Sequence, residues 1–549
     1  MVREYGGREV DGQPLSPGFT RRTRGAIYFA AAKAGALMST LEGRSMSADV
    51  TPNRRAADHY ALALVLLAFF AVHSLTLIRV PFPFIDEILM AEPAINFATG
   101  RGFTSAAWHN SSSEETWAAP QPLYPLYLSA WVWLLGASQE TTRTASLFLT
   151  AAGLVLVWHA ARRLGIVRTV SGRVWLSALI ICDYGYAYAY KFARPEPIAV
   201  FACACMFFAF SVRPAIRFPL LFCCALLIAF IGLQVVAFLL LLGFVLVVAL
   251  RGKVLMEALV VGVGLGLGVL AFHLLYRHLG MWPGFVKELE FNGSTSLVER
   301  VWFRLTTNPM ATHSHTIPKD FSMIWMGLAI VVTSVWMAKR RALTFSSAGG
   351  IGLMVAIVVP AGMYLGLRFP TYYSWMLAVP LAVIYNAAWE APEIAGLRKW
   401  LLALQSAACL NGLPLIITSS FPDWKERDTR PVEELIAATV RSDDVAFCDH
   451  TAYFATKAAA RAVYMPMYMQ RMTPAEAARV TVAVLNDHTT PPLMMTKEQQ
   501  LATLGGEWTK VGEYRPARRS WLGNDWQLGF LSLPNYTLEV YRRATPAIP

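Results

Sequence analysis

Residues 60–80 read YALALVLLAFFAVHSLTLIRV and lead directly into PFPFIDE at residues 81–87. A helix needs roughly 20 apolar residues to cross the hydrocarbon of a bilayer, so residues 60–80 predict a membrane-spanning helix. The segment before it, residues 1–59, is polar and basic. Because Lys and Arg favour the cytoplasmic side and no small-residue cleavage pattern follows the apolar run, we expect a cytoplasmic N-terminus and an anchor, not a signal peptide.

The whole chain has the composition of a membrane protein. Of its 549 residues, 55% are hydrophobic and only 15% are charged, whereas soluble domains are about 25% charged. The net charge of +12 comes from Lys and Arg in short loops between apolar runs, which indicates membrane orientation and not nucleic-acid binding. Six of the seven cysteines lie in apolar runs, so we expect no disulfide framework.

The apolar run at residues 121–136 decides the orientation of every later segment. It is short and is followed by SQETT, not by basic residues. As a full crossing it would turn the next basic loop outward; as an interfacial or re-entrant helix it places four basic loops on the cytoplasmic side, and we adopt this second reading. The loops carry Arg162, Arg163, Arg168 and Arg173; Arg213 and Arg217; Arg251 and Lys253; and Lys339, Arg340 and Arg341.

The resulting topology has about eleven crossings. The outer side holds residues 81–142, residues 277–320 and the tail from residue 421. Residues 217–250 must then contain two short helices with a turn near Gly232; a single long, tilted helix is the alternative. The crossings are expected at about 60–80, 143–161, 173–191, 197–212, 217–233, 235–250, 255–276, 321–338, 348–366, 371–389 and 400–419.

The tail, residues 421–549, has the character of a soluble sequence and predicts a small α/β domain outside the membrane. Val432–Val440 has a helical pattern, and Thr496 with Gln499 forms a capping-box signature. Short strands are expected at Val445–Cys448, Ala462–Met465 and Val480–Leu485. The predicted fold class is therefore mainly α: a polytopic transmembrane helical bundle over residues 60–420, followed by a soluble α/β domain.

Adjacent carboxylates at Asp86 and Glu87 follow the first crossing directly. Charges this close to hydrocarbon are costly and often functional. An aspartate at the lipid–water boundary can accept a proton from an acceptor hydroxyl as a general base, and partial burial raises its pKa toward a useful range. The alternative is a solvated helix N-terminus, where acids are favoured by the helix dipole.

Two further outer turns carry charge. The first contains Lys191, Arg194 and Glu196, which suit either a substrate site or a local Arg–Glu pair. The second places Arg368 beside Tyr372 and Tyr373. A cation flanked by aromatic side chains at the interface suits a lipid phosphate, although interfacial tyrosines also anchor helices.

Evidence for a cofactor is weak in this sequence. His109, His313 and His315 fall in outer loops, but no clustered Asp, Glu and His set accompanies them. We predict no metal and no other cofactor; a divalent metal is the less favoured alternative. A glycine-rich stretch, Val261–Gly268, mimics a nucleotide-binding loop, but it lies inside an apolar run and indicates helix packing.

The order of these segments resembles the GT-C superfamily of polytopic glycosyltransferases. One crossing leads to the acid pair at 86–87, then to a Pro-Leu-Tyr-Pro-Leu segment at 122–126, an Arg-Pro-acid turn at 194–196 and an Arg-Phe-Pro-x-Tyr-Tyr turn at 368–373. The resemblance covers roughly residues 60–420. More narrowly, it is to the bacterial branch related to protein O-mannosyltransferases and the aminoarabinose transferase of lipid A.

The resemblance implies a sugar donor on a polyprenyl phosphate and an acceptor hydroxyl at the outer face of the bacterial cytoplasmic membrane. Asp86 matches the family's base, with Glu87 completing the pair, and Glu196 matches the second acid, where many relatives have Asp. Arg368 matches the late basic residue that meets the donor phosphate. Lys191, Arg194, Tyr372 and Tyr373 complete the expected phosphate-binding side. This branch is generally metal-independent, and a single displacement would invert the anomeric carbon.

Other functions remain open from the sequence alone. A transporter or flippase of a lipid-linked sugar would be expected to show broken helices in pairs or an internal duplication, and neither is evident. A glycan ligase would use the same site with a different substrate. An inactive scaffold would tolerate Asp86→Asn. The acceptor can be a lipid, a polysaccharide or a protein.

Overall fold

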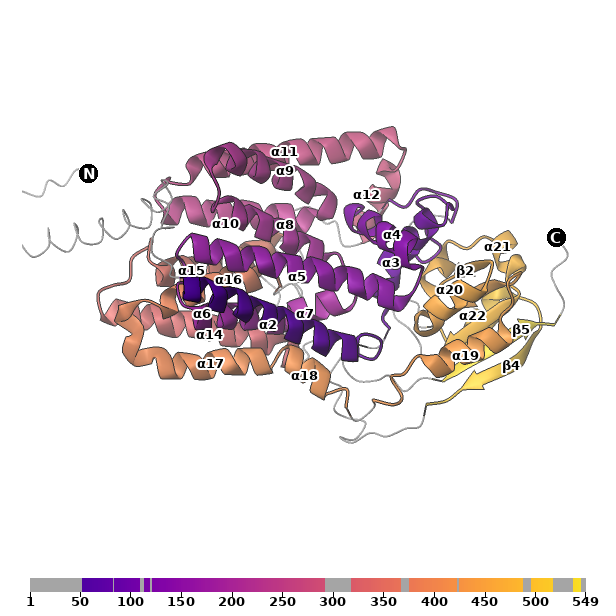
Figure 1. The fold of residues 1–549 in the computed structure, drawn as a ribbon. Coiled ribbons are helices and arrows are strands. Elements are labelled where there is room, and N and C mark those ends of the chain that lie inside the picture. Colours follow the sequence, from indigo (N-terminus) through magenta and orange to yellow (C-terminus); the bar gives the residue numbers. More distant parts are fainter. Residues whose placement is uncertain are drawn as a thin grey trace, which may run out of the picture. The chain divides into compact units, whose positions relative to one another are not determined.

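The computed structural model describes residues 52–81, 83–108, 113–118, 121–291, 317–366, 375–421, 424–486, 495–516 and 537–544. Helices dominate up to residue 418, and the long ones run side by side (Figure 1). They are α2 (Pro52–Thr76), α3 (Ile85–Ala98), α4 (Leu123–Leu135), α5 (Gln139–Arg163), α6 (Val170–Cys182), α7 (Tyr184–Lys191), α8 (Glu196–Ala209), α9 (Pro214–Ile231), α10 (Leu233–Ala249), α11 (Leu255–His278), α12 (Trp282–Phe291), α14 (Ile317–Lys339), α15 (Ala348–Gly366), α16 (Trp375–Trp389), η2 (Pro392–Leu397), α17 (Arg398–Leu410) and α18 (Leu413–Thr418).

The mainly α, polytopic character predicted from the sequence is confirmed. Within the described part of the chain, six helical segments are long and apolar enough to cross a membrane, and a seventh is obtained if α7 and α8 form one bent span. Further apolar helices are shorter: α4, α6, α10, α16 and residues 324–339 of α14. The count of about eleven crossings therefore stays a prediction.

The apolar run at residues 217–250 is divided as expected. Helix α9 ends at Ile231 and α10 begins at Leu233, so the two helices meet at Gly232. The alternative of one long, tilted helix is wrong.

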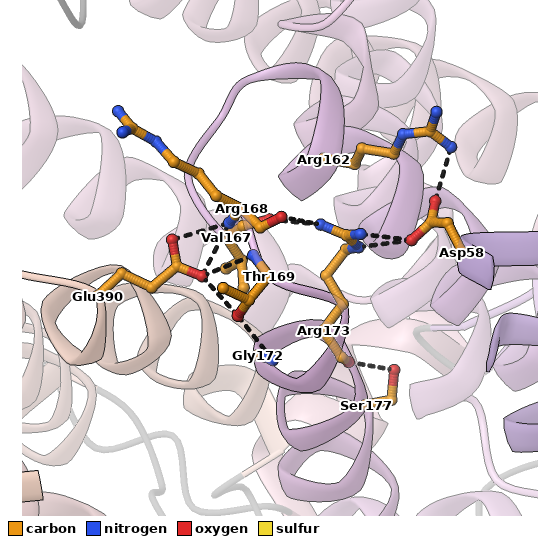
Figure 2. Close-up of polar contacts among 9 residues, drawn as sticks. All are labelled: Asp58, Arg162, Val167, Arg168, Thr169, Gly172, Arg173, Ser177 and Glu390. Carbon is orange, nitrogen blue, oxygen red and sulfur yellow. Dashed lines mark hydrogen bonds and ion pairs between the residues drawn. The ribbon is translucent and has the colours of Figure 1, made fainter. Parts of the chain in front are cut away.

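A polar network joins four helix ends at one side of the bundle (Figure 2). Asp58 on α2 accepts hydrogen bonds from Arg162, at 2.6 Å, and from Nε of Arg173, at 3.0 Å. Glu390, directly after α16, accepts from the backbone N–H groups of Arg168 at 2.8 Å and Thr169 at 2.9 Å. The start of α2, the end of α5, the start of α6 and the end of α16 are thereby held together.

The opposite end of α5 is held by Arg143. This side chain donates to the carbonyl oxygens of Leu77, at 2.7 Å, and Pro81, at 2.9 Å, just after α2. Arg143 and Arg162 are about 28 Å apart along α5, so α2 and α5 run antiparallel and the chain between them leaves and returns at one end of the bundle. This arrangement supports the interfacial or re-entrant reading of residues 121–136, which form α4.

Glycines on α11 allow close packing against α9. A Cβ atom on Gly264 would lie 2.8 Å from the Ala225 Cβ, and one on Gly268 would lie 2.4 Å from the Leu226 carbonyl oxygen. Small residues four apart let helix backbones approach closely in a membrane. The glycine-rich stretch thus has the packing role predicted for it.

The tail forms a mixed five-stranded sheet with strand order β2-β1-β3-β5-β4. Strand β1 pairs parallel with β2 and β3, whereas β5 pairs antiparallel with β3 and β4. Its elements are α19 (Arg430–Thr439), β1 (Val445–Cys448), η3 (His450–Ala452), α20 (Tyr453–Ala459), β2 (Ala462–Tyr464), η4 (Pro466–Gln470), α21 (Pro474–Arg479), β3 (Val482–Asn486), α22 (Lys497–Leu504), β4 (Trp508–Tyr514) and β5 (Leu538–Arg543).

The structure contains the helix and the three strands that the sequence predicted for the tail. Helix α19 and strands β1, β2 and β3 occupy the expected positions within one or two residues, and Thr496 and Gln499 form the expected capping box of α22. Strands β4 and β5 were not expected. Strand β4 reads WTKVGEY and is mostly exposed, so it lacks the apolar run that marks the buried strands.

We expect Gly268→Ala to destabilise the protein because its methyl group would overlap the backbone of α9. Overpacking of this kind costs about 1–3 kcal/mol. The test is the thermal unfolding midpoint of the purified protein in detergent. Gly266→Ala is the matched control on the same helix, since a Cβ there meets no atom within 4 Å. Equal midpoints for the two variants would contradict the close approach of α9 and α11.

Candidate functional site

The first turn of α3 carries both predicted acids, but they differ in environment. Glu87 is fully buried, and its two carboxylate oxygens accept from Nε and a terminal nitrogen of Arg143, each at 2.8 Å. A buried, bidentate pair of this geometry is well satisfied. The Glu87 carboxylate is therefore held in an ion pair with Arg143.

Arg143 is the important residue of this region that sequence reasoning missed. It holds Glu87 and the two carbonyl oxygens that follow α2, so it joins the starts of α3 and α5 to the end of α2. One signal was available in the sequence: Arg143 stands at the first position of the apolar run expected at residues 143–161. A cation at the edge of a crossing needs an anionic or carbonyl partner nearby.

The turn between α7 and α8 brings the other predicted residues to α3. The chain bends by 118° between the two helices, and Ala193 in the turn has a φ of 49°, a left-handed conformation that a non-glycine residue rarely adopts. Arg194 donates to Glu196 at 2.8 and 3.1 Å and also forms an ion pair with Asp86. The sharp turn thus places one guanidinium between two carboxylates.

Lys191 lies on the same side of the bundle. Its ammonium group donates to the Thr76 hydroxyl at 2.8 Å and to the Val80 carbonyl at 3.0 Å, and the residue is buried. Both partners are uncharged, and the ion pairs found across the described residues give Lys191 no carboxylate. It therefore places a buried amino group close to the end of α2.

Asp86 is the accessible member of the acid cluster. Its side chain is 35% exposed, against 4% for Glu196 and 9% for Arg194. Loss of hydration raises the pKa of Asp86 above the ordinary value of 3.8, the Arg194 guanidinium opposes the rise, and the Glu196 carboxylate adds to it. A partly exposed carboxylate with a raised pKa, beside a cation, has the properties of a general base.

Aromatic rings border the cluster. Phe84, the residue before α3, lies 5.5 Å from the Phe192 ring, and the Arg194 guanidinium lies 5.7 Å from the Tyr188 ring. These contacts keep water from part of the charged cluster and strengthen its electrostatic interactions.

Five of the eight predicted site residues, Asp86, Glu87, Lys191, Arg194 and Glu196, are thus gathered around the starts of α3 and α8. Arg368, Tyr372 and Tyr373 lie outside the described residues, as do His109, His313 and His315. Across the described ranges, no group of three or more His, Cys, Asp and Glu side chains could hold a metal ion.

Two crystal structures of ArnT from Cupriavidus metallidurans are similar to this chain. The one bound to undecaprenyl phosphate aligns with a TM-score of 0.54 and 14% identity, over 89% of this chain and 99% of that chain. The apo structure gives 0.54 and 14%, over 90% and 100%. No protein-family model and no curated protein matches the sequence. The predicted resemblance to the aminoarabinose transferase of lipid A is therefore confirmed for the fold.

We expect Arg143→Gln to be strongly destabilising because it leaves Glu87 charged and unpaired in the interior. Breaking one partner out of a buried ion pair costs about 3–5 kcal/mol. Thermal unfolding in detergent provides the measurement, with Arg101→Gln, an exposed arginine of the first outer loop, as the control. Adding Glu87→Gln to Arg143→Gln should recover part of the loss. An unfolding midpoint like that of the control would show that the pair is dispensable.

Proposed function

We propose that this chain, which has the fold of a lipid A aminoarabinose transferase, is a membrane glycosyltransferase. It moves a sugar from a polyprenyl-phosphate donor to an acceptor hydroxyl at the outer face of the bacterial cytoplasmic membrane. The observation that carries the proposal is the ion pair of the accessible Asp86 with Arg194. The buried amino group of Lys191, three residues before Arg194 in the chain, lies at the end of α2. The fold and the undecaprenyl phosphate bound to one ArnT structure support the class of donor.

Asp86 acts as the general base in this proposal. Its carboxylate accepts the proton of the acceptor hydroxyl as the hydroxyl oxygen attacks the anomeric carbon. The bond from that carbon to the polyprenyl phosphate breaks, and the phosphate leaves with the bonding electrons. A single displacement of this kind inverts the anomeric configuration, so a product with retained configuration would contradict it.

Cations stabilise the leaving phosphate. Lys191 suits this role because its neighbours are a hydroxyl and a carbonyl, so an incoming phosphate would be the first anionic partner of its protonated amino group. Arg194 is shared with Asp86 and Glu196 and orients the base. Arg368, Tyr372 and Tyr373 stay predicted donor ligands. Glu87 is assigned the structural role of pairing Arg143.

We further propose that transfer proceeds without a metal. The three carboxylates of the cluster are Asp86, Glu87 and Glu196, and each of them is already paired with an arginine, since Arg143 holds Glu87 and Arg194 is shared by the other two. A divalent cation would have to displace these guanidinium groups.

The proposed topology is multi-pass, with the N-terminus in the cytoplasm and the tail outside. Arg79, just after α2, donates to Asp428 of the tail at 2.9 Å, which puts the tail at the same end of the bundle as Asp86. The basic loops 161–173 and 339–341 then face the cytoplasm. The acceptor can be a lipid, a polysaccharide or a protein.

We expect Asp86→Asn to abolish transfer, with a loss of at least about 100-fold, because the amide cannot accept the proton. Membranes are incubated with radiolabelled polyprenyl-phosphate sugars, and the label in the product identifies the acceptor. Glu114→Gln, an exposed carboxylate of the same outer loop, is the matched control. If Asp86→Asn transfers sugar like the control, Asp86 is not the base; if the wild type transfers from no donor, the proposed activity is wrong.

As the pH is lowered, the rate of transfer should begin to fall at a higher pH than it would if the base were an aspartate with an ordinary pKa. The base must be ionised, and the pKa of Asp86 is raised above 3.8, so activity is present above that raised pKa and is lost as pH falls through it. The measurement is kcat against pH at saturating donor. A rate that stays constant down to pH values near 3.8 would exclude Asp86 as the titrating group.

A further inference from the structure

The tail contacts the end of the first expected crossing and the first outer loop at several points. Three hydrogen bonds involve residues before or after α3. Arg79 donates to Asp428 at 2.9 Å, the Met465 N–H donates to the Ala106 carbonyl at 3.1 Å, and the Ser113 hydroxyl donates to Glu476 at 2.7 Å. The His450 ring also lies 6.4 Å from the ring of Phe84, the residue that precedes α3. The residues that precede and follow α3 thus both contact the tail.

The deepest of these contacts reaches the middle of α3. Glu92 is 1% exposed and accepts hydrogen bonds from the Tyr453 hydroxyl and, at 2.9 Å, from the Lys457 ammonium group on α20. Lys457 also donates to the Asn96 side chain at 2.9 Å. Two side chains of α20 therefore hold two successive turns of α3.

Helix α3 needs such external support. Pro93 lies inside it, and a proline removes one backbone hydrogen bond and disturbs the preceding turn. Glu92 and Asn96 stand on either side of that weak point, and Lys457 contacts both. Asp86 is about 9 Å along the helix from Glu92, so a shift of the helix at Glu92 moves the carboxylate relative to Arg194.

We propose that Lys457 and Tyr453 are positioning residues for the transfer reaction. Through Glu92 they hold α3 in the position where Asp86 pairs with Arg194. The tail thus positions the proposed general base. This inference rests on the proposed function. Misplacement of a reacting group by about 1 Å can cost about 100-fold in rate, which makes a clamp on this helix effective at a distance.

The experiment compares three variants of the full chain in detergent. Lys457→Met leaves the Glu92 carboxylate buried without its cation; the double variant Lys457→Met with Glu92→Gln removes the stranded charge. Lys510→Met is the matched control, because Lys510 pairs with Glu539 inside the sheet. Two experiments are made on each variant: hydrogen–deuterium exchange of residues 85–98, and steady-state kinetics that give kcat per folded molecule and the donor KM.

For Lys457→Met we expect exchange of α3 to be faster by at least about tenfold, because the loss of a buried partner weakens the local structure. We expect kcat to fall at least about tenfold with donor KM within about twofold, since Lys191 is not displaced. The double variant should recover kcat to within about threefold of wild type, as expected when an unpaired buried charge is removed. A purely structural role would lower the folded fraction and leave kcat per folded molecule unchanged.

Exchange and kcat that match those of Lys510→Met would overturn the proposal, as would failure of Glu92→Gln to rescue kcat. If the wild type transfers no sugar, the proposed function fails by itself, and hydrogen–deuterium exchange alone then decides whether the tail holds α3. Unchanged exchange in Lys457→Met would overturn the clamp in that case too.

Discussion

Arg143 and Glu87 form a bidentate ion pair in the interior, and the remaining donor of that arginine holds the two carbonyl oxygens at the end of α2. Neither charge is tolerable there alone, because an unpaired buried ion costs several kcal/mol. The pair therefore fixes the starts of α3 and α5 against α2. Asp86, one residue before Glu87, takes its place at the surface of the cluster as a consequence.

The three carboxylates of the cluster differ in their exposure to solvent, and this difference separates their proposed roles. Glu87 and Glu196 are buried against arginines, whereas Asp86 keeps a third of its surface in contact with solvent while sharing Arg194. In the proposed reaction, burial raises the pKa of Asp86, and its exposed part gives an acceptor access to the carboxylate. The tail then contributes rigidity from the other side of α3. Chemistry and support thus come from segments more than three hundred residues apart in the chain.

The sequence predicted the helical bundle, the split at Gly232 and the core strands of the tail, because long apolar runs and short β-branched runs are local signals. It also singled out five charged residues that lie close together in the structure, since an acid pair after a crossing and an Arg-Pro-acid turn are local patterns; their role in a reaction stays a prediction. Arg143 and Lys457 were missed. Their partners are 56 and 365 residues away in the chain. A single sequence contains no local pattern that identifies pairs so far apart.

The central claim is that the cluster around Asp86 is where a lipid-linked sugar donor reacts. The most direct measurement is an experimental structure of the full chain with undecaprenyl phosphate bound. The account predicts the phosphate within hydrogen-bond distance of Lys191 or Arg194, with the Asp86 carboxylate beside it. A phosphate bound instead at the opposite end of α5, among Arg162 and Arg173, would contradict the account.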